Sequence, residues 1–214
     1  MESTCKKIRP DTYNYDSIDG HSYGTWNMEV GYGLVDAYAA LNLAQQMSGY
    51  LYVKDTLVNV NTDWHGNRMI NKDLTIDSLV RLSIFDTVFV AKGARIIVRP
   101  GGKLVVDGGT ITSACSGEMW QGIEVVGNPD KRQIPQWQGV VELKNGATIE
   151  NAHCAIRTGL QGDSVYVTTG GIIQADSAFF INNRRSVEFM SYTNHSRQAM
   201  SSTTRVTSTD VYSP

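Results

Sequence analysis

Carboxylates and arginines are the residues of this chain that could act on a polysaccharide, as acid, base or calcium ligand. Those that stand in strand-like segments are Asp107, Glu124, Glu142, Glu150, Arg184 and Arg185. Glu142 and Glu150 fall on different strand segments. Nothing in the spacing brings two carboxylates within the roughly 5–9 Å that glycoside hydrolysis requires. We therefore expect these charges at solvated, outward positions, with Arg184 and Arg185 forming a surface pair with Glu188.

Two tryptophans offer a second kind of chemistry, the stacking of an indole ring on a sugar. Trp120 stands in Met-Trp-Gln-Gly, and Trp137 lies at the end of a loop-like segment with two prolines and mixed charge, residues 128–138. An exposed indole is a good stacking surface, whereas a buried one fills a core. For Trp120 the sequence favours packing that braces the strand Gly122–Val126. Ligand stacking remains an alternative for both tryptophans.

The three cysteines, Cys5, Cys115 and Cys154, form no CxxC pair, so no structural zinc site is expected. Their odd number excludes a fully paired disulfide framework. We expect buried free thiols, with a Cys115–Cys154 bridge as the alternative. His153 and Cys154 are neighbours on a strand and should point to opposite faces, Cys154 inward, which does not favour a metal pair. The sequence indicates no cofactor.

Composition excludes two broad classes of partner. The chain has 214 residues and a formal net charge of -2, so it lacks the basic balance typical of nucleic-acid binding. No apolar run approaches the roughly 18 residues of a membrane span, and the first ten residues contain no apolar signal region. The chain is long enough for one domain, or for one domain and a fragment.

The elements that would position these residues are short strands punctuated by glycine. In Ala91–Ser113 the glycines recur every seven to nine residues, with β-branched runs between them. Such runs predict strands, and glycine supplies the turns. Short strands at near-regular spacing are typical of a sandwich, a barrel or a β-solenoid.

An internal repeat favours the solenoid. Gly139 matches Gly171 at an offset of 32 residues, and further matches follow at an offset of 31, so one residue is gained or lost in the first turn. The later matches are Ala147 with Ala178, Ile149 with Phe180, Asn151 with Asn182 and Ile156 with Val187. We therefore predict a mainly β fold, a right-handed parallel β-helix, in which Asn151 and Asn182 form an internal ladder at a sharp turn.

The first 47 residues differ from the rest. Gly31 and Gly33 mark a turn, and the apolar residues from Leu34 onward predict a helix that fades near residues 47–49. Asp36 is expected in its first turn, where a negative charge suits the helix dipole. The apolar face consists of Leu34, Ala37, Tyr38 and Leu41. This face should either dock on the following domain or be poorly packed.

The segment GTWNMEVGYGLVDAYAAL, Gly24–Leu41, resembles the closing segment of subtilisin-like serine peptidases, where G-x-G-x-[VIL]-[ND]-A leads into the last helix of the catalytic domain. Glu2–Ile8 resembles the preceding helix end of that family, EST-x-x-K-I. The resemblance covers roughly residues 1–46. It implies that the structural residues of the motif are Gly31, Gly33, Asp36 and Ala37.

The catalytic Asp, His and Ser of that family precede this segment in chain order. His21 in DGHSY and His65 in DWHGN do not match the family's motifs, and the chain has no matching serine motif. No catalytic residue is therefore carried over. We expect this chain to be inactive alone, and its first partner to be an upstream peptidase domain that it does not contain.

The region Val58–Tyr192 resembles the parallel β-helix segments found downstream of secreted peptidases and other surface proteins of Bacteroidetes-type bacteria. The resemblance rests on GARIIVRPGGKLVVDGGTIT, GEMWQGIEV and NGATIENAHCAI. It implies a secreted or cell-surface location, and a glycan or protein substrate as a second partner.

Together these patterns predict three parts: a peptidase remnant at residues 1–48, a parallel β-helix at 50–192 and a Ser/Thr-rich tail at 193–214. We expect the tail to be disordered, although it could supply a last frayed coil. The predicted function is a non-catalytic piece of an exported peptidase, with a β-helix for attachment, spacing or substrate engagement. The alternatives are a carbohydrate-binding or adhesive module and, less favoured, a polysaccharide enzyme.

Overall fold

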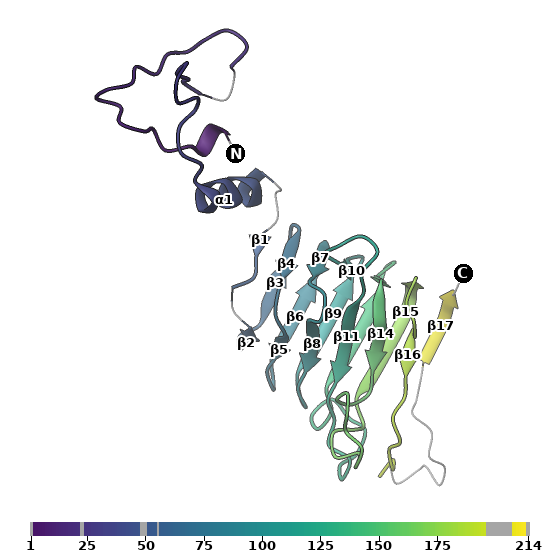
Figure 1. Ribbon diagram of the computed structural model, residues 1–214. Coiled ribbons are helices and arrows are strands. Elements are labelled where there is room, and N and C mark those ends of the chain that lie inside the picture. The colour runs from purple at the N-terminus through teal and green to yellow at the C-terminus, as the bar shows by residue number, and fades with distance from the viewer. Residues whose placement is uncertain (1, 22–23, 48–50, 55, 196–206, 213–214) are drawn as a thin grey trace. The chain divides into compact units, whose positions relative to one another are not determined.

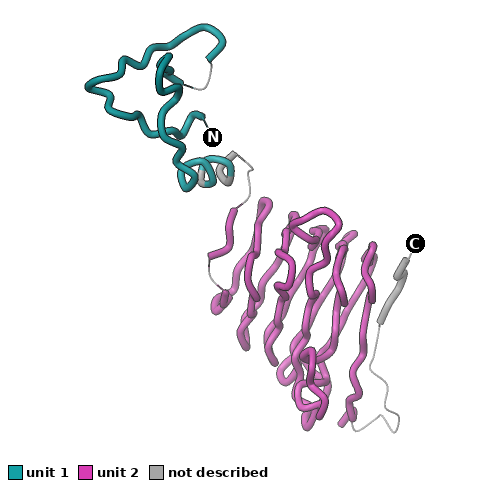
Figure 2. Tube along the Cα trace, viewed as in Figure 1, with its two compact units in different colours: residues 1–50 teal, residues 51–214 magenta. Residues whose placement is uncertain are grey.

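The computed structural model describes residues 2–21, 24–47, 51–54, 56–195 and 207–212. The chain divides into two compact units, Met1–Tyr50 and Leu51–Pro214 (Figure 2). Each unit is described by itself. Among the described residues, no helix has the length and apolar character needed to cross a bilayer.

The first unit contains one short 3-10 helix, η1 (Glu2–Thr4), and one α-helix, α1 (Ala37–Met47). The chain between them is irregular and is held by isolated antiparallel bridges. These bridges join Lys6 to Leu34, Asp16 to Trp26 and Asn27 to Gly31.

Helix α1 begins at Ala37, three residues later than the sequence predicts, and Asp36 is its N-cap instead of part of its first turn. The Asp36 carboxylate accepts a hydrogen bond from the Ala39 amide at 2.9 Å, and the Asp36 carbonyl accepts one from Ala40. Leu34 is not part of the helix because its N–H and its carbonyl are both hydrogen-bonded to the backbone of Lys6. The cap satisfies amides that the first turn leaves unpaired.

The second unit is built of short strands in which every strand pairing among the described residues is parallel. Each strand pairs with strands about three places away along the chain, so the strands form three rows (Figure 1). The first row is β1 (Leu51–Tyr52), β4 (Arg68–Ile70), β7 (Thr87–Val90), β10 (Thr110–Ser113) and β13 (Thr148–Glu150). The second row is β3 (Thr62–Trp64), β6 (Arg81–Ile84), β9 (Lys103–Asp107) and β12 (Val140–Lys144).

The third row is β2 (Leu57–Val58), β5 (Leu74–Ile76), β8 (Arg95–Val98), β11 (Trp120–Val125), β14 (Ala152–Arg157) and β16 (Val187–Glu188). It forms a 6-stranded sheet. The long strand β15 (Ile172–Ile181) pairs with both β12 and β13, and so joins the first two rows into one sheet. This sheet has 11 strands when β17 (Thr207–Tyr212), which pairs with β15, is included. The prediction of a mainly β fold with stacked parallel strands is confirmed.

The core of this unit is a set of aliphatic ladders between successive coils. In the second row Leu82 pairs with Leu104, Leu104 with Val141, and Val141 with Ile173, and all four are buried. Burying one such side chain contributes about 1.5–3 kcal/mol. The alternation of inward aliphatic and outward polar residues thus fixes the register of each strand.

The glycine-spaced stretch forms the strands and turns that its pattern predicts. Gly93, Gly101 and Gly108 all have positive φ, between 70° and 82°, and separate β7, β8, β9 and β10. Asn145 and Ser177 occupy the positions that stack on Gly108 in the next two coils, and both also have positive φ, 56° and 54°. The left-handed turn is therefore kept from coil to coil.

The internal repeat is confirmed residue by residue. Val140 pairs with Ile172, directly after the matched glycines, and Ile149 pairs with Phe180. Between the two pairings the first coil has one residue more than the second, which explains the change of offset from 32 to 31. Ile156 pairs with Val187 in the third row, so the match holds around the whole coil.

The asparagine ladder exists but is not internal. The Asn182 amide donates to Asn151 Oδ1 at 2.6 Å, and the Asn151 amide donates to Thr112 Oγ1 at 3.0 Å. Asn182 is exposed and Asn151 is half-buried, and both have positive φ, 50° and 58°.

Two longer loops interrupt the coils. Residues 126–139 separate β11 from β12, as the sequence predicts, and residues 158–171 separate β14 from β15. Of the predicted disordered tail, residues 196–206 and 213–214 lie outside the described residues. The strand β17 (Thr207–Tyr212) pairs in parallel with β15, so over these six residues the tail adds a strand, as the alternative of a last coil predicts.

Candidate functional site

A groove of about 220 Å³ lies on the outer surface of the third row, over β11 and β14, and we call it the β11–β14 groove. It is lined by Gln121, Ile123, Glu124, His153, Cys154, Arg157, Gln161, Arg184 and Arg185. The two strands are not in even register here: Gly122 pairs with Cys154, but Ile123 pairs with Ile156. Such bulges re-aim side chains and are enriched beside binding sites.

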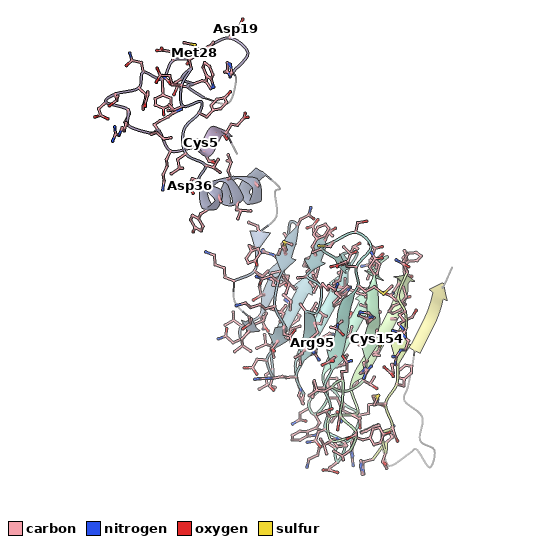
Figure 3. All side chains as sticks on the ribbon, in the orientation of Figure 1. Cys5, Asp19, Met28, Asp36, Arg95 and Cys154 are labelled. Atoms are coloured by element: carbon pink, nitrogen blue, oxygen red, sulfur yellow. The ribbon has the colours of Figure 1, made fainter. Side chains whose placement is uncertain are left out.

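Glu124 forms the floor of the groove and is only 5% exposed. Its Oε1 atom accepts hydrogen bonds from Arg95 Nη1 and from the backbone N–H of Gln161, both at 3.1 Å. Arg95, labelled in Figure 3, is also 3.3 Å from Asp73 Oδ2. The Glu124 Oε2 atom is enclosed and has no hydrogen-bond partner among the described residues. A buried carboxylate oxygen without a hydrogen-bond donor is energetically unfavourable, and the described residues supply no donor to this atom.

Glu188 does not line the groove itself but is held by two arginines that do, Arg157 and Arg185. Arg157 Nη2 lies 2.6 Å from its Oε2 atom, and Arg185 Nη1 lies 2.6 Å from its Oε1 atom. The expected surface pair of Arg185 with Glu188 is thus present, with Arg157 as a third member. Each carboxylate oxygen of Glu188 thus has a guanidinium partner, and such charge-assisted contacts fix the position of the side chain.

Cys154, labelled in Figure 3, lies next to Glu188, with its Sγ atom 3.7 Å from Glu188 Oε2. Burial, and then the negative charge of Glu188, raise the pKa of the Cys154 thiol. The thiolate is the nucleophilic form of cysteine, so the raised pKa and the burial of Cys154 both disfavour reaction at this thiol.

Four side chains of the groove keep free hydrogen-bonding groups. The side chains of Gln121, His153, Gln161 and Arg184 have no partner among the described residues, and the last three are exposed. Amides both donate and accept, and guanidinium only donates. The groove therefore presents a cation and several polar groups to whatever enters it.

Of the six charged residues singled out in the sequence, the groove brings together three, Glu124, Arg184 and Arg185. Asp107 and Glu142 lie elsewhere, on β9 and β12 of the second row. Glu150 lies on β13 of the first row. Glu142 and Glu150 are on different strands, as expected.

Asp107 and Glu142 belong to a network of ion pairs that links neighbouring coils. Lys103 pairs with Glu142, and Lys144 Nζ lies 3.4 Å from Asp107 and 3.5 Å from Glu142. The Lys103 ammonium lowers the pKa of the Glu142 carboxyl, and Asp107 and then Glu142 raise the pKa of Lys144. These shifts favour the ionised forms of Glu142 and Lys144, so the ion pairs brace neighbouring coils of the second row.

The two tryptophans have different environments. Trp120 is completely buried and donates from Nε1 to the Glu150 carbonyl at 2.9 Å, so it has no ring face to offer a sugar. Trp137 is 39% exposed, and the Lys131 ammonium lies 5.4 Å from its ring centroid. Of the two, only Trp137 is placed where a ligand could reach it.

The cysteine and histidine predictions need correction in part. None of the three cysteines forms a disulfide, but only Cys154 is buried; Cys115 is exposed and Cys5 is half-buried. His153 and Cys154 do not serve opposite faces, because the bulge in β14 directs both to the groove. No cluster of three or more metal-binding side chains occurs in the described parts of the chain.

In the first unit, the residues of the peptidase-like motif hold one turn together. The Asp36 carboxylate caps α1 and also lies 3.0 Å from Lys6 Nζ. A Cβ atom on Gly33 would lie 2.3 Å from the Lys6 carbonyl oxygen, so only glycine fits there. Gly31 has positive φ, and Ala37 is the first residue of α1 and is exposed.

The helix face predicted to be apolar is exposed. Leu34, Tyr38 and Leu41 are each more than 60% accessible, and the neighbouring Val35 is 59% accessible. The first unit by itself therefore leaves this face accessible, and the expectation that it either docks on the following domain or is poorly packed stays a prediction.

Sequence reasoning did not identify Arg95, Gln121, Arg157 or Gln161 as members of one site. Arg95 is 29 residues from Glu124, and Gln161 is 37 residues from it. No local spacing signals these contacts, because they depend on which coils stack.

Comparison of the chain with models of known protein families, with curated proteins and with solved structures finds no match.

Proposed function

We propose that this chain is the C-terminal part of a secreted subtilisin-like serine peptidase of a Bacteroidetes-type bacterium, carrying an accessory module at the cell surface. The module is residues 50–192, which we assign to a right-handed parallel β-helix. Its role is attachment, spacing or engagement of substrate, and it has no catalytic function of its own.

The observation that carries this proposal is the contact between the two peptidase-like segments. Lys6, from the first segment, pairs with Leu34 through two backbone hydrogen bonds and with Asp36 through its side chain. The two resemblances therefore meet in one turn, as parts of one inherited motif would. The exposed face of Leu34, Tyr38 and Leu41 suits a helix that packs on a larger domain.

The β-helix assignment is supported by the threefold strand order and by the continuous aliphatic ladders. Parallel strands joined by crossovers are nearly always right-handed, which gives the proposed hand. Stacked coils make a stiff rod, a form that suits a spacer or a binding surface.

The test has two parts. The reading frame upstream of Met1 in the source genome should encode the family's catalytic motifs, in the order Asp, His and Ser; a frame without them would refute the peptidase assignment. The purified chain should hydrolyse no casein above the buffer background, and measurable hydrolysis would show a catalytic site that the proposal denies.

A carbohydrate-binding module is the second candidate, and the β11–β14 groove favours it. The groove presents unpaired amide, imidazole and guanidinium groups, which are typical partners of sugar hydroxyls. A glycan-binding screen tests this role. Trp137→Ala in that screen would show whether its half-exposed ring contributes a second contact.

A further inference from the structure

We propose that the β11–β14 groove binds a uronic acid residue of an acidic polysaccharide. The inference rests on the binding role proposed for the second unit, and it does not depend on the peptidase resemblance. It follows from the groups of the groove that have partners and from those that lack them.

The groove has an excess of positive charge. Arg95, Arg157, Arg184 and Arg185 stand in or beside it, against the carboxylates of Asp73, Glu124 and Glu188. Three of the four arginines are committed to these carboxylates. Arg184 is exposed and has no partner among the described residues, so it is the cation available to an incoming anion.

The side chains around Arg184 set a second requirement. Gln121 is half-buried and Gln161 is exposed, and neither side chain has a partner among the described residues. A side-chain amide both donates and accepts, so a suitable ligand brings groups that do the same. An ammonium group is disfavoured because four arginines surround the site, whereas a neutral hydroxyl meets the requirement without adding positive charge.

A ligand with an anionic end and hydroxyl groups fits both requirements. Gln121 and Gln161 add side-chain amides that can donate and accept, which suits neighbouring hydroxyls of a sugar ring. The groove volume of about 220 Å³ is below the roughly 300–1,000 Å³ of sites for drug-sized ligands, so it accommodates a single ring. Inorganic phosphate would satisfy Arg184 but would lack the neighbouring hydroxyls.

The experiment is calorimetric titration of the full chain with trimers of galacturonic, glucuronic and mannuronic acid. At least one trimer should bind, and its methyl ester should bind at least about ten-fold more weakly, because esterification removes the charge and keeps the ring hydroxyls. Inorganic phosphate should not displace the trimer at matched concentration.

Arg184→Ala should weaken binding of the trimer at least about ten-fold, and Gln121→Ala should weaken it by a smaller factor. Arg132→Ala is the matched control, because it removes an exposed arginine that does not line the groove. It should leave the affinity unchanged. Circular dichroism of each variant confirms that the fold is retained.

Binding that survives both groove substitutions would overturn the assignment to this groove while leaving the binding role of the unit in place. Equal binding of the methyl ester, or displacement by phosphate, would overturn the ligand class. Absence of binding by all three trimers would refute the inference. The peptidase proposal would still be decided separately by the upstream reading frame.

Discussion

Gly122 packs directly against the backbone of Cys154 on the neighbouring strand. A Cβ atom at Gly122 would lie 1.6 Å from the Cys154 carbonyl oxygen, and the φ of Gly122 is +110°. This contact sits where the register of β11 and β14 changes, at the groove. The bulge that turns His153 and Cys154 toward one surface therefore depends on the absence of a side chain at Gly122.

Gly122→Ala should lower the free energy of unfolding by more than about 3 kcal/mol, because the new methyl group meets backbone that cannot move aside. Gly93→Ala is the matched control: it also has positive φ, but nothing lies within 4 Å of its added Cβ. It should cost only the backbone strain, about 1–2 kcal/mol. Urea denaturation measures both, and equal losses would disprove the close-contact argument.

The asparagine ladder allows hydrogen bonding and backbone strain to be separated. Asn151→Ala should be destabilising by about 2–3 kcal/mol, because it removes two amide hydrogen bonds and places alanine at a φ of 58°. Asn151→Gly removes the same bonds but tolerates the positive φ, so it should be less destabilising by about 1 kcal/mol. If the two variants unfold at the same urea concentration, backbone strain plays no part there.

Asp36 should titrate below the ordinary aspartate value of 3.8, because the Ala39 amide and then Lys6 lower its pKa. Since the folded-state pKa is the lower one, the stabilisation is complete above the ordinary value and is lost as the pH falls through the folded-state value. Carbon-detected NMR titration measures this pKa. Lys6→Gln should raise it only part of the way, since the amide bond remains.

Asp36→Asn provides the control for that titration, because asparagine caps a helix without titrating. Amide exchange over Ala37–Met47 should become faster in the parent chain as the pH falls to about 2, after correction for intrinsic rates. In the variant the corrected rates should stay constant. A parallel loss of protection in the variant would show that Asp36 is not the group responsible.

The three thiols should react at different rates. Cys115 is exposed and should be alkylated first by iodoacetamide at about pH 8, whereas Cys154 is buried, has a raised pKa and should stay unmodified until the chain unfolds. Mass spectrometry of the labelled peptides, with and without urea, measures this difference. Cys115→Ser should remove the fast phase alone, and rapid labelling of Cys154 in the folded chain would contradict its burial.

Much of the fold could be predicted because the pattern repeats. The strands and turns of Ala91–Ser113 follow from residue types, and the match of Ile149 with Phe180 follows from equal neighbours at a nearly constant offset. The start of α1 could not be predicted to the residue, because the apolar period continues through Leu34. Only its bridge to Lys6 removes that residue from the helix.

The sequence by itself determined that a small helical segment is followed along the chain by a series of short, stacked strands. It could do so because glycine spacing and β-branched runs act within a few residues. Tertiary structure alone decided the groove. Arg95, Glu124 and Gln161 meet because β8, β11 and the loop after β14 stack in consecutive coils, and loops of unequal length separate those coils. Outward positions are not constrained by the core, so which of them become neighbours is set by coil stacking and not by local pattern.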